Sequence, residues 1–435
     1  MKIIRYSVLV LLIGSLSSCL KTQFEEVELT SGNANFTNYI AVGNSLTQGF
    51  QDNGLHNRLG EQSNSYPAII AQQMKLVNPG MNAFKQPLVT GNGSGYVHLA
   101  YINGELEAIK PGEPGAYEAD PSWSSWGDKN QTYNNLGIAG IRLADCVPTQ
   151  GDPFSSTINQ VITSNNPFGR FLDFGTTLIN EVSYLDHVQA SNATFFTCWL
   201  GNNDVLGWAT NGGDDGEISI FGIPFPVKTS PLTDVTEFRQ KYDAILDAFQ
   251  SMGAKGICAT LPDVSSIPFF NTVTKETVGV TDMWITEGDG TTVRKLGAGD
   301  LILLTALDSI EQQGEGLSQS KPLRHTYVLD AAEVQQVQNH TIQLNNEIKA
   351  SAAAHGYGVV DMFSYLETLE SSIKVDGIEF STKFVEGGAF SLDGVHPNQR
   401  GYALVANKFI EAINQTYGSN IPLVDVGKYK GIIFP

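Results

Sequence analysis

The sequence predicts a three-layer α/β/α protein, in which a parallel sheet of about five strands is covered by helices on both faces. Two observations support this prediction. Short apolar runs alternate with amphipathic helical patterns along most of the chain, which is typical of parallel sheets. Hydrophobic residues make up 41% of the 435 residues and charged residues only 16%. This composition can form a large core and excludes general disorder.

Five short runs rich in apolar residues are predicted to form the strands of the sheet. Strands of a parallel sheet are buried on both faces, so continuous apolar runs are expected there instead of a strict alternation. In chain order, the runs are residues 39–43, 133–138, 194–200, 256–261 and 358–362.

Helical patterns are predicted between these runs, at residues 66–76, 172–188, 234–252, 330–354 and 398–414. The last pattern is the clearest. Val405, Phe409, Ala412 and Ile413 fall at the spacing that places them on one face of a helix. We therefore expect that face to pack against the sheet.

Residues 38–435 are predicted to form one domain with three long insertions. Connections between neighbouring elements usually have two to six residues, and three connections are much longer. They are residues 77–130, 205–232 and 264–329. The first insertion contains many aromatic residues, including Trp123 and Trp126. They could line a groove for a lipid chain, stack on sugar rings, or pack the insertion onto the core, and the sequence leaves these alternatives open.

The N-terminus is interpreted as an export signal covering residues 1–18. Lys2 and Arg5 precede an apolar stretch at residues 8–16, which is too short to span a bilayer. The small residues before Cys19 make the end of this stretch resemble the bacterial lipobox. That resemblance implies cleavage before Cys19 and acylation of this cysteine as a lipid anchor. The alternative is an ordinary signal peptide followed by a chance cysteine.

Residues 19–37 are polar and acidic and are predicted to be a flexible tether between the anchor and the folded body. The expected location is therefore the cell envelope, as a lipoprotein of the outer membrane. The lipid, not charge attraction, would hold the protein to the membrane, because the chain carries a formal net charge of −19.

The acidic composition also argues against nucleic acid as a partner, since 45 Asp and Glu outnumber 26 Lys and Arg and repel phosphate backbones. Cys146, Cys198 and Cys258 are predicted to be buried free thiols. No cofactor and no metal site are expected. The sequence has no C-x-x-C pair, and the acidic residues 214–217 lack the spacing of a calcium loop. The sequence does not predict an oligomeric state.

Four segments at or near strand ends contain residues suited to catalysis, and open parallel sheets place their ligands at such ends. They are residues 41–47, 135–140, 200–204 and 393–398. In the last segment, Asp393 lies three residues before His396, where its carboxylate could hold one imidazole nitrogen protonated. His396 could then take a proton from the hydroxyl of Ser45. The alternatives are a helix-capping role for Ser45 and a surface histidine at 396.

The other two segments are candidates for stabilising negative charge. The glycines at 137 and 140 would let the backbone approach a ligand, although such a turn is often only a turn. The Asn203 side chain could donate a hydrogen bond to an oxyanion, and the alternative is a turn that caps the preceding strand.

Together the four segments resemble the SGNH or GDSL family of serine esterases and lipases. The matching sequences are Gly43-Asn44-Ser45-Leu46, Gly201-Asn202-Asn203-Asp204 and Asp393 to His396, together with Asn135 and the glycine five residues after it. The resemblance implies a flavodoxin-like fold, with Ser45 as nucleophile, His396 as general base and Asp393 as the residue that orients it. It also implies an oxyanion hole made by the backbone N–H groups of Ser45 and Gly140 and the Asn203 side chain. Asn44 replaces the aspartate of the family pattern.

The resemblance thus implies a serine esterase or lipase that hydrolyses carboxylic esters through an acyl-enzyme, with no cofactor. Two alternatives stay open: a carbohydrate O-acetyl esterase of the same fold, and a surface lipoprotein that binds without catalysis. Small-molecule, lipid and glycan esters are all possible substrates. The three insertions match no pattern, and we expect them to determine the choice of substrate.

Overall fold

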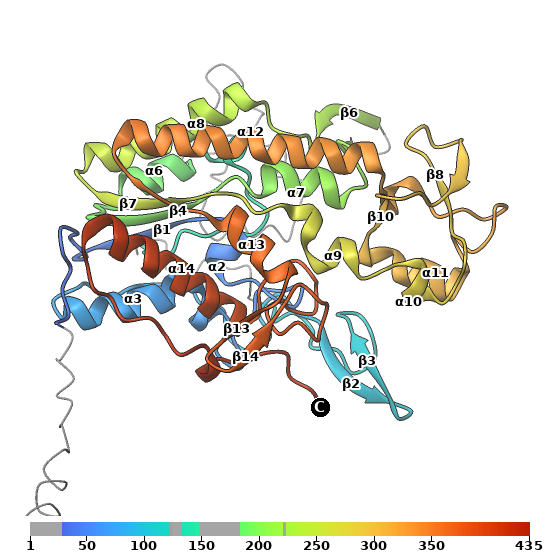
Figure 1. The fold of residues 1–435 in the computed structure, drawn as a ribbon, viewed down its shortest axis with the longest axis horizontal. Coiled ribbons are helices and arrows are strands. Elements are labelled where there is room, and N and C mark those ends of the chain that lie inside the picture. The colour runs from blue at the N-terminus through green and yellow to red at the C-terminus, as the bar shows by residue number, and fades with distance from the viewer. Residues whose placement is uncertain (1–27, 122, 124–131, 148–182, 221–222) are drawn as a thin grey trace, which may run out of the picture.

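A computed structural model describes residues 28–121, 123, 132–147, 183–220 and 223–435. Its centre is a four-stranded parallel sheet in the order β1-β4-β7-β12. The strands are β1 (Tyr39–Gly43), β4 (Phe195–Trp199), β7 (Lys255–Ala259) and β12 (Gly358–Val360). Figure 1 shows this sheet between two helical layers, which confirms the predicted α/β/α architecture.

The expected fifth strand, at residues 133–138, is not a regular strand. It lies beside β1 and exchanges backbone hydrogen bonds with it: Ala41 N–H donates to Asn134, and Leu136 N–H donates to Ala41. Only the pair Ala41 and Asn135 forms a bridge. The Asn134 N–H donates to Lys85 instead of to β1, and the Tyr184 hydroxyl lies between the Gly43 N–H and the Leu136 carbonyl. With this segment at the edge, the spatial order is the flavodoxin-like 2-1-3-4-5.

Strands β1 and β4 are buried along their whole length, as expected for a parallel sheet covered on both faces. They pair in register from Tyr39 opposite Phe195 to Gly43 opposite Trp199. Their carboxyl ends therefore lie together at one edge of the sheet.

Each face of the sheet is covered by a pair of long helices. One layer contains α8 (Val235–Ser251) and α12 (Ala331–His355), and the other contains α3 (Tyr66–Val77) and α14 (Gln399–Tyr417) (Figure 1). Phe196 of β4 stacks on Phe249 of α8 with ring centroids 4.0 Å apart. On the other side, Phe409 of α14 stacks on Tyr66 of α3 at 4.9 Å. The predicted apolar face of the last helix is thus in the core.

The helix predicted at 172–188 is largely untested, and the end of the last predicted strand differs from the structure. Most of the helix expected at 172–188 lies outside the described residues, which contain α6 (Tyr184–Gln189) at its end. The run at 358–362 ends its strand at Val360, and α13 (Met362–Glu370), which was not predicted, begins two residues later.

The folded body begins before residue 38, where we expected the tether to end. Phe36 is fully buried and packs edge-to-face against Phe195, and Asn33 N–H donates to Tyr417. The polar character of this segment suggested a tether, but one buried aromatic ring and its backbone hydrogen bonds attach it to the domain. The signal segment and Cys19 lie outside the described residues.

The first two insertions each contain an antiparallel hairpin. The pairs are β2 (His98–Ile102) with β3 (Glu105–Ile109), and β5 (Glu217–Ile220) with β6 (Ile223–Lys228). The second insertion is shorter than expected, because helix α7 (Asn203–Thr210) occupies its start.

The third insertion, residues 264–329, forms a lobe with a hydrophobic cluster of its own, which includes Met283, Ile285 and Leu323. The lobe lies at the right end of Figure 1, and Lys110, just after β3, forms an ion pair with Asp308 of the lobe. Its elements are α9 (Pro268–Asn271), α10 (Lys275–Val278), β8 (Trp284–Thr286), β9 (Val293–Lys295), β10 (Leu301–Ile302), α11 (Leu307–Gln313) and β11 (Val328–Leu329).

The remaining short elements are α2 (Ser45–Gln48), α4 (Leu143–Cys146), β13 (Ile373–Val375) and β14 (Ile378–Phe380). Cys146, Cys198 and Cys258 are buried and free, as predicted. Within the described ranges, no helix has the length and apolar character needed to cross a membrane.

Candidate active site

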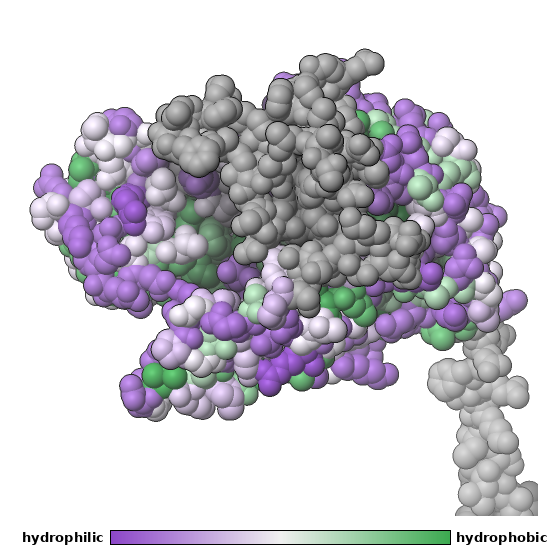
Figure 2. Space-filling view, turned by 180° about the vertical axis from the view of Figure 1, so that it is seen from behind, coloured by the Kyte–Doolittle hydropathy of each residue, from purple (hydrophilic) through white to green (hydrophobic). Residues whose placement is uncertain are grey.

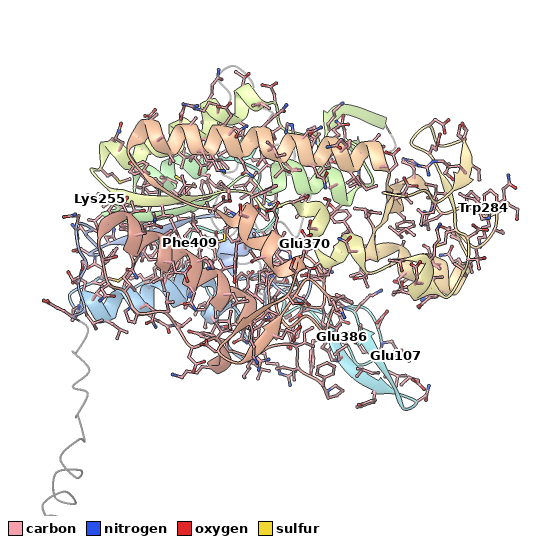
Figure 3. The ribbon with its side chains drawn as sticks, in the orientation of Figure 1. Glu107, Lys255, Trp284, Glu370, Glu386 and Phe409 are labelled. Atoms are coloured by element: carbon pink, nitrogen blue, oxygen red, sulfur yellow. The ribbon has the colours of Figure 1, made fainter. Side chains whose placement is uncertain are left out.

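The candidate site lies at the carboxyl edge of the sheet. Figure 3 labels Lys255, the first residue of β7, at the left end of the molecule, so the strands run from there towards the middle of the view. Helix α2 follows β1 directly and α7 follows β4, so Ser45 and Asn203 each begin a helix at this edge. The predicted positions at strand ends are therefore correct for both residues.

The turn that carries Ser45 depends on a glycine. A Cβ atom on Gly43 would lie 1.9 Å from the Thr47 hydroxyl oxygen, so no other residue fits between β1 and α2. The side chain of Asn44 caps α2 by accepting the N–H of Leu46 at 3.0 Å. Because Asn44 is the cap, the alternative capping role for Ser45 is excluded, and the Ser45 hydroxyl is available for another partner.

That partner is His396, although 351 residues separate the two in the chain. Ser45 Oγ lies 2.8 Å from His396 Nε2, and His396 Nδ1 lies 2.9 Å from Asp393 Oδ2. The three side chains thus form a continuous hydrogen-bonded series. This geometry suits transfer of the serine proton to the imidazole, with the carboxylate holding the other nitrogen protonated.

Asp393 is held as a carboxylate by its surroundings. Burial would raise its pKa, but the charge and hydrogen bond of His396 and the N–H groups of His396 and Asn53 outweigh burial and lower the pKa to about 2. Its Oδ1 accepts the N–H groups of Val395 and His396, both at 2.8 Å, and its Oδ2 accepts that of Asn53 at 2.8 Å. The side chain therefore has a fixed orientation and charge.

The turn at Asp52 and Asn53 clamps the segment that carries His396, which we call the histidine loop (residues 391–396). Asp52 N–H donates to Ser391 Oγ at 2.9 Å, and Asp52 Oδ1 accepts the N–H of Leu392 at 2.9 Å. Asp52 and Asn53 both have positive φ, a conformation that Asp and Asn tolerate better than most residues. This clamp was not predicted, although the Asp-Asn-Gly sequence at 52–54 is a turn signal.

The structure describes all three predicted oxyanion donors. Ser45 is the first residue of α2, so its N–H has no acceptor within the helix. Gly140 has φ of 80°, a left-handed conformation that favours glycine, and the space beside its Cα is open. The Asn203 Nδ2 donates to the carbonyl of Ile141 at 2.9 Å, and its second hydrogen is free for another acceptor.

Two buried polar side chains hold the segment that contains Gly140. Gln48 Oε1 accepts the N–H of Ala139 at 2.9 Å. Asp204 accepts the N–H groups of Leu143 and Ala144 at 2.7 and 3.2 Å and the hydroxyl of Thr233 at 2.7 Å.

Asp204 is fully buried, and burial raises its pKa to about 6 although these hydrogen bonds act in the opposite direction. Asp204 lies in the predicted 200–204 segment, but this supporting role was not predicted.

A cavity is lined by residues adjacent in sequence to Ser45 and His396. Its walls are apolar and come from the ends of the strands, from α13 and α14, and from the histidine loop. They include Leu46, which follows Ser45, and Val395 and Pro397, which flank His396. Figure 2, which views the molecule from behind, also shows a hydrophobic hollow between the lobe and the β2–β3 hairpin.

The described part of the chain contains no group of three or more His, Cys, Asp or Glu side chains placed to hold a metal ion. The arrangement at Ser45 uses only a hydroxyl, an imidazole, a carboxylate and hydrogen-bond donors. Such a set can support nucleophilic attack on a carbonyl carbon.

Comparison with known proteins gives one family. The family model for GDSL-like lipase/acylhydrolase matches residues 39–409. None of the curated proteins matches the chain.

Two solved structures illustrate the structural likeness. One is a catalytic mutant of an acetylxylan esterase from Geobacillus stearothermophilus, at 12% identity and a TM-score of 0.36, with 87% of this chain and 95% of that chain covered. Another is described as a candidate GDSL-like lipase from Parabacteroides merdae, at 12% identity and a TM-score of 0.35, with 88% and 99% covered. Likenesses at this level are too weak to carry a functional assignment.

Proposed function

The chain belongs to the GDSL-like lipase/acylhydrolase family, and on this premise we propose that it hydrolyses carboxylic esters through an acyl-enzyme on Ser45. The observation that carries the proposal is the hydrogen-bonded series from Ser45 Oγ through His396 to Asp393, with distances of 2.8 and 2.9 Å. A hydroxyl, an imidazole and a carboxylate in this order form a general-base-activated nucleophile.

In the proposed first half-reaction, Ser45 Oγ attacks the ester carbonyl carbon while His396 Nε2 takes the hydroxyl proton. The carbonyl oxygen becomes an oxyanion that accepts hydrogen bonds from the N–H groups of Ser45 and Gly140 and from Asn203 Nδ2. His396 then gives its proton to the leaving alcohol oxygen, and the ester bond breaks. The acyl group stays on Ser45.

In the second half-reaction, His396 takes a proton from water, and the resulting hydroxide attacks the acyl carbon. The same three donors stabilise the second oxyanion, and the proton returns to Ser45 Oγ as the acid leaves. Asp393 keeps His396 in the required tautomer and stabilises the imidazolium in both halves.

We propose that the acyl part of the substrate enters the apolar cavity beside Ser45. This is supported by Leu46, Val395 and Pro397, which line the cavity and are adjacent in sequence to Ser45 and His396. Hydrocarbon is the group that such a wall accommodates, because it leaves no polar group unpaired.

We also propose that the mature protein is a lipoprotein of the cell envelope, acylated on Cys19. The lipobox-like sequence before Cys19 supports this. In cells grown with an alkyne-modified palmitate, the wild-type protein is expected to take up the label and Cys19→Ala to lose it. Equal labelling of both would contradict the anchor.

The hydrolysis proposal is tested with p-nitrophenyl esters from acetate to palmitate, using residues 20–435. Activity is expected for the wild type and is expected to be lost in Ser45→Ala and in His396→Ala. An inert wild-type protein would instead favour a non-catalytic binding lipoprotein. Activity that survives Ser45→Ala would remove Ser45 from the mechanism.

A further inference from the structure

A second cavity adjoins the histidine loop at Leu392, and we call it the His56 cavity. It is bounded by the segment from Gln51 to Glu61, the start of β2, Tyr117, Leu392 and the last residues of the chain. Unlike the apolar cavity, it combines charged, amide, aromatic and aliphatic side chains. None of these groups has a part in the proposed ester hydrolysis.

His56 is the most unusual residue in this cavity. Its side chain is only 1% exposed, yet neither ring nitrogen has a hydrogen-bond partner among the described residues. The nitrogens lie 3.4 Å from Asp52 Oδ2 and 3.6 Å from Glu61 Oε2, slightly too far for good hydrogen bonds. The ring itself is fixed, because it stacks on Tyr96 with centroids 3.7 Å apart.

Further unpaired groups line the same cavity. Gln51 Oε1 is buried and accepts no hydrogen bond from the described residues, while its Nε2 donates to Asp52 at 3.1 Å. His98 Nδ1 is also buried without a partner in the described part of the chain. A buried polar group without a partner costs roughly 1–3 kcal/mol, so several of them in one cavity indicate a place that a polar ligand, or water in its absence, fills.

The remaining wall offers flat and apolar surfaces. The Arg58 guanidinium lies 4.3 Å from the centre of the Tyr117 ring, and His98 stacks on the same tyrosine at 3.9 Å. Val97, Leu99 and Ile432 complete the cavity with aliphatic surface.

The mixture of groups determines the ligand class. An anion would be repelled by Asp52 and Glu61. A protonated amine could pair with these carboxylates, but it has no acceptor for the N–H groups of His56 and Arg58. A hydroxyl group can donate to Gln51, Asp52 or Glu61 and can also accept from His56 or Arg58. A ligand with several hydroxyls and an apolar C–H face therefore satisfies both the polar groups and the aromatic walls.

We propose that the His56 cavity binds a neutral sugar ring, namely the alcohol part of the ester substrate. This inference rests on the proposed ester hydrolysis and adds the class of substrate. The link to the reaction is structural: Asp52 and Leu392 line the cavity and are hydrogen-bonded to each other at 2.9 Å, next to Asp393. A sugar in the cavity thus contacts the same turn that clamps the histidine loop.

The test measures binding of unesterified xylotriose, cellotriose and N,N′,N″-triacetylchitotriose by calorimetry, which requires no ester hydrolysis. At least one of them is expected to bind the wild-type protein with a dissociation constant of about 1 mM or tighter. Tyr117→Ala is expected to weaken that binding about tenfold or more, because it removes an aromatic wall. His56→Gln is expected to weaken saccharide binding as well, because the amide does not place its polar atoms where the imidazole nitrogens lie.

Tyr101→Ala is the matched control, since Tyr101 is 62% exposed on β2 and does not line the cavity. It is expected to bind the saccharide like the wild type. Thermal unfolding of each variant separates a lost contact from a lost fold.

Three results would overturn the proposal: no binding of any saccharide, equal binding by the Tyr117 and Tyr101 variants, or binding of choline or inorganic phosphate in place of sugars. A protein that binds a saccharide but hydrolyses no ester would refute the proposed function and leave the sugar site standing.

Discussion

Replacing Asp393 by Asn is the most informative single change at the site. Asp393 accepts four hydrogen bonds, two on each oxygen, and all four donors are N–H groups. An amide has only one oxygen, so in either orientation its NH₂ group faces donors. If it faces His396, the imidazole must take the tautomer that protonates Nε2, and His396 can no longer accept the Ser45 proton.

We expect Asp393→Asn to lower kcat by roughly 10³–10⁴-fold, which corresponds to about 4–5.5 kcal/mol in the activation barrier. The assay is steady-state hydrolysis of p-nitrophenyl acetate. Asp308→Asn, which changes an exposed carboxylate of α11 in the same way, is expected to leave the rate unchanged. A folded Asp393→Asn protein that keeps more than about a tenth of wild-type kcat would refute the proposed role of Asp393.

The same substitution has a signature in stability. The folded-state pKa of Asp393 is about 2 against an ordinary value of 3.8, so the ionised group stabilises the fold by about 2 kcal/mol. Because the pKa is lowered, this stabilisation is fully present above pH 3.8 and is lost as the pH falls towards 2. The wild type is expected to lose this increment in acid unfolding experiments, and Asp393→Asn is expected to lack it.

Three further predictions follow from the same geometry. Asn203→Ala is expected to lower kcat by about 10²–10³-fold with little change in KM, since one oxyanion donor is removed. A variant whose KM rises by a larger factor than its kcat falls would contradict that role. Asp204 has its pKa raised from 3.8 to about 6 by burial, so it is expected to destabilise the wild type by up to about 3 kcal/mol as the pH rises from 4 to 6. Thermal unfolding across that range should show a decline that is absent in Asp204→Asn. Ala389→Leu adds a side chain to the apolar cavity and is expected to shift the p-nitrophenyl ester preference to shorter chains, and an unchanged profile would remove the acyl group from that cavity.

Local patterns were sufficient to predict most of the sheet and the long helices. Runs such as 39–43 and 194–200 are apolar because both faces of a parallel strand are buried, so their sequences carry the signal directly. The run at 133–138 has the same apolar signal, but the backbone N–H groups of two consecutive asparagines donate to Lys85. This contact lies far away in sequence, so the local pattern of apolar residues does not predict it.

The candidate site was predictable where short motifs contain it. Ser45 and His396 each lie in a recognisable segment, and the structure brings them within 2.8 Å. The turn at Asp52 and Asn53 was not predicted, because its function depends on loop contacts more than 300 residues away in sequence. The His56 cavity was missed for the same reason: its residues come from five separate parts of the chain.

The most direct test of the proposed mechanism is covalent labelling with a fluorophosphonate, read by mass spectrometry of the intact and digested protein. We expect one adduct, on the peptide that contains Ser45, no adduct in Ser45→Ala, and much slower labelling in His396→Ala. A label on another residue, or undiminished labelling of Ser45→Ala, would contradict the assignment of Ser45 as the nucleophile.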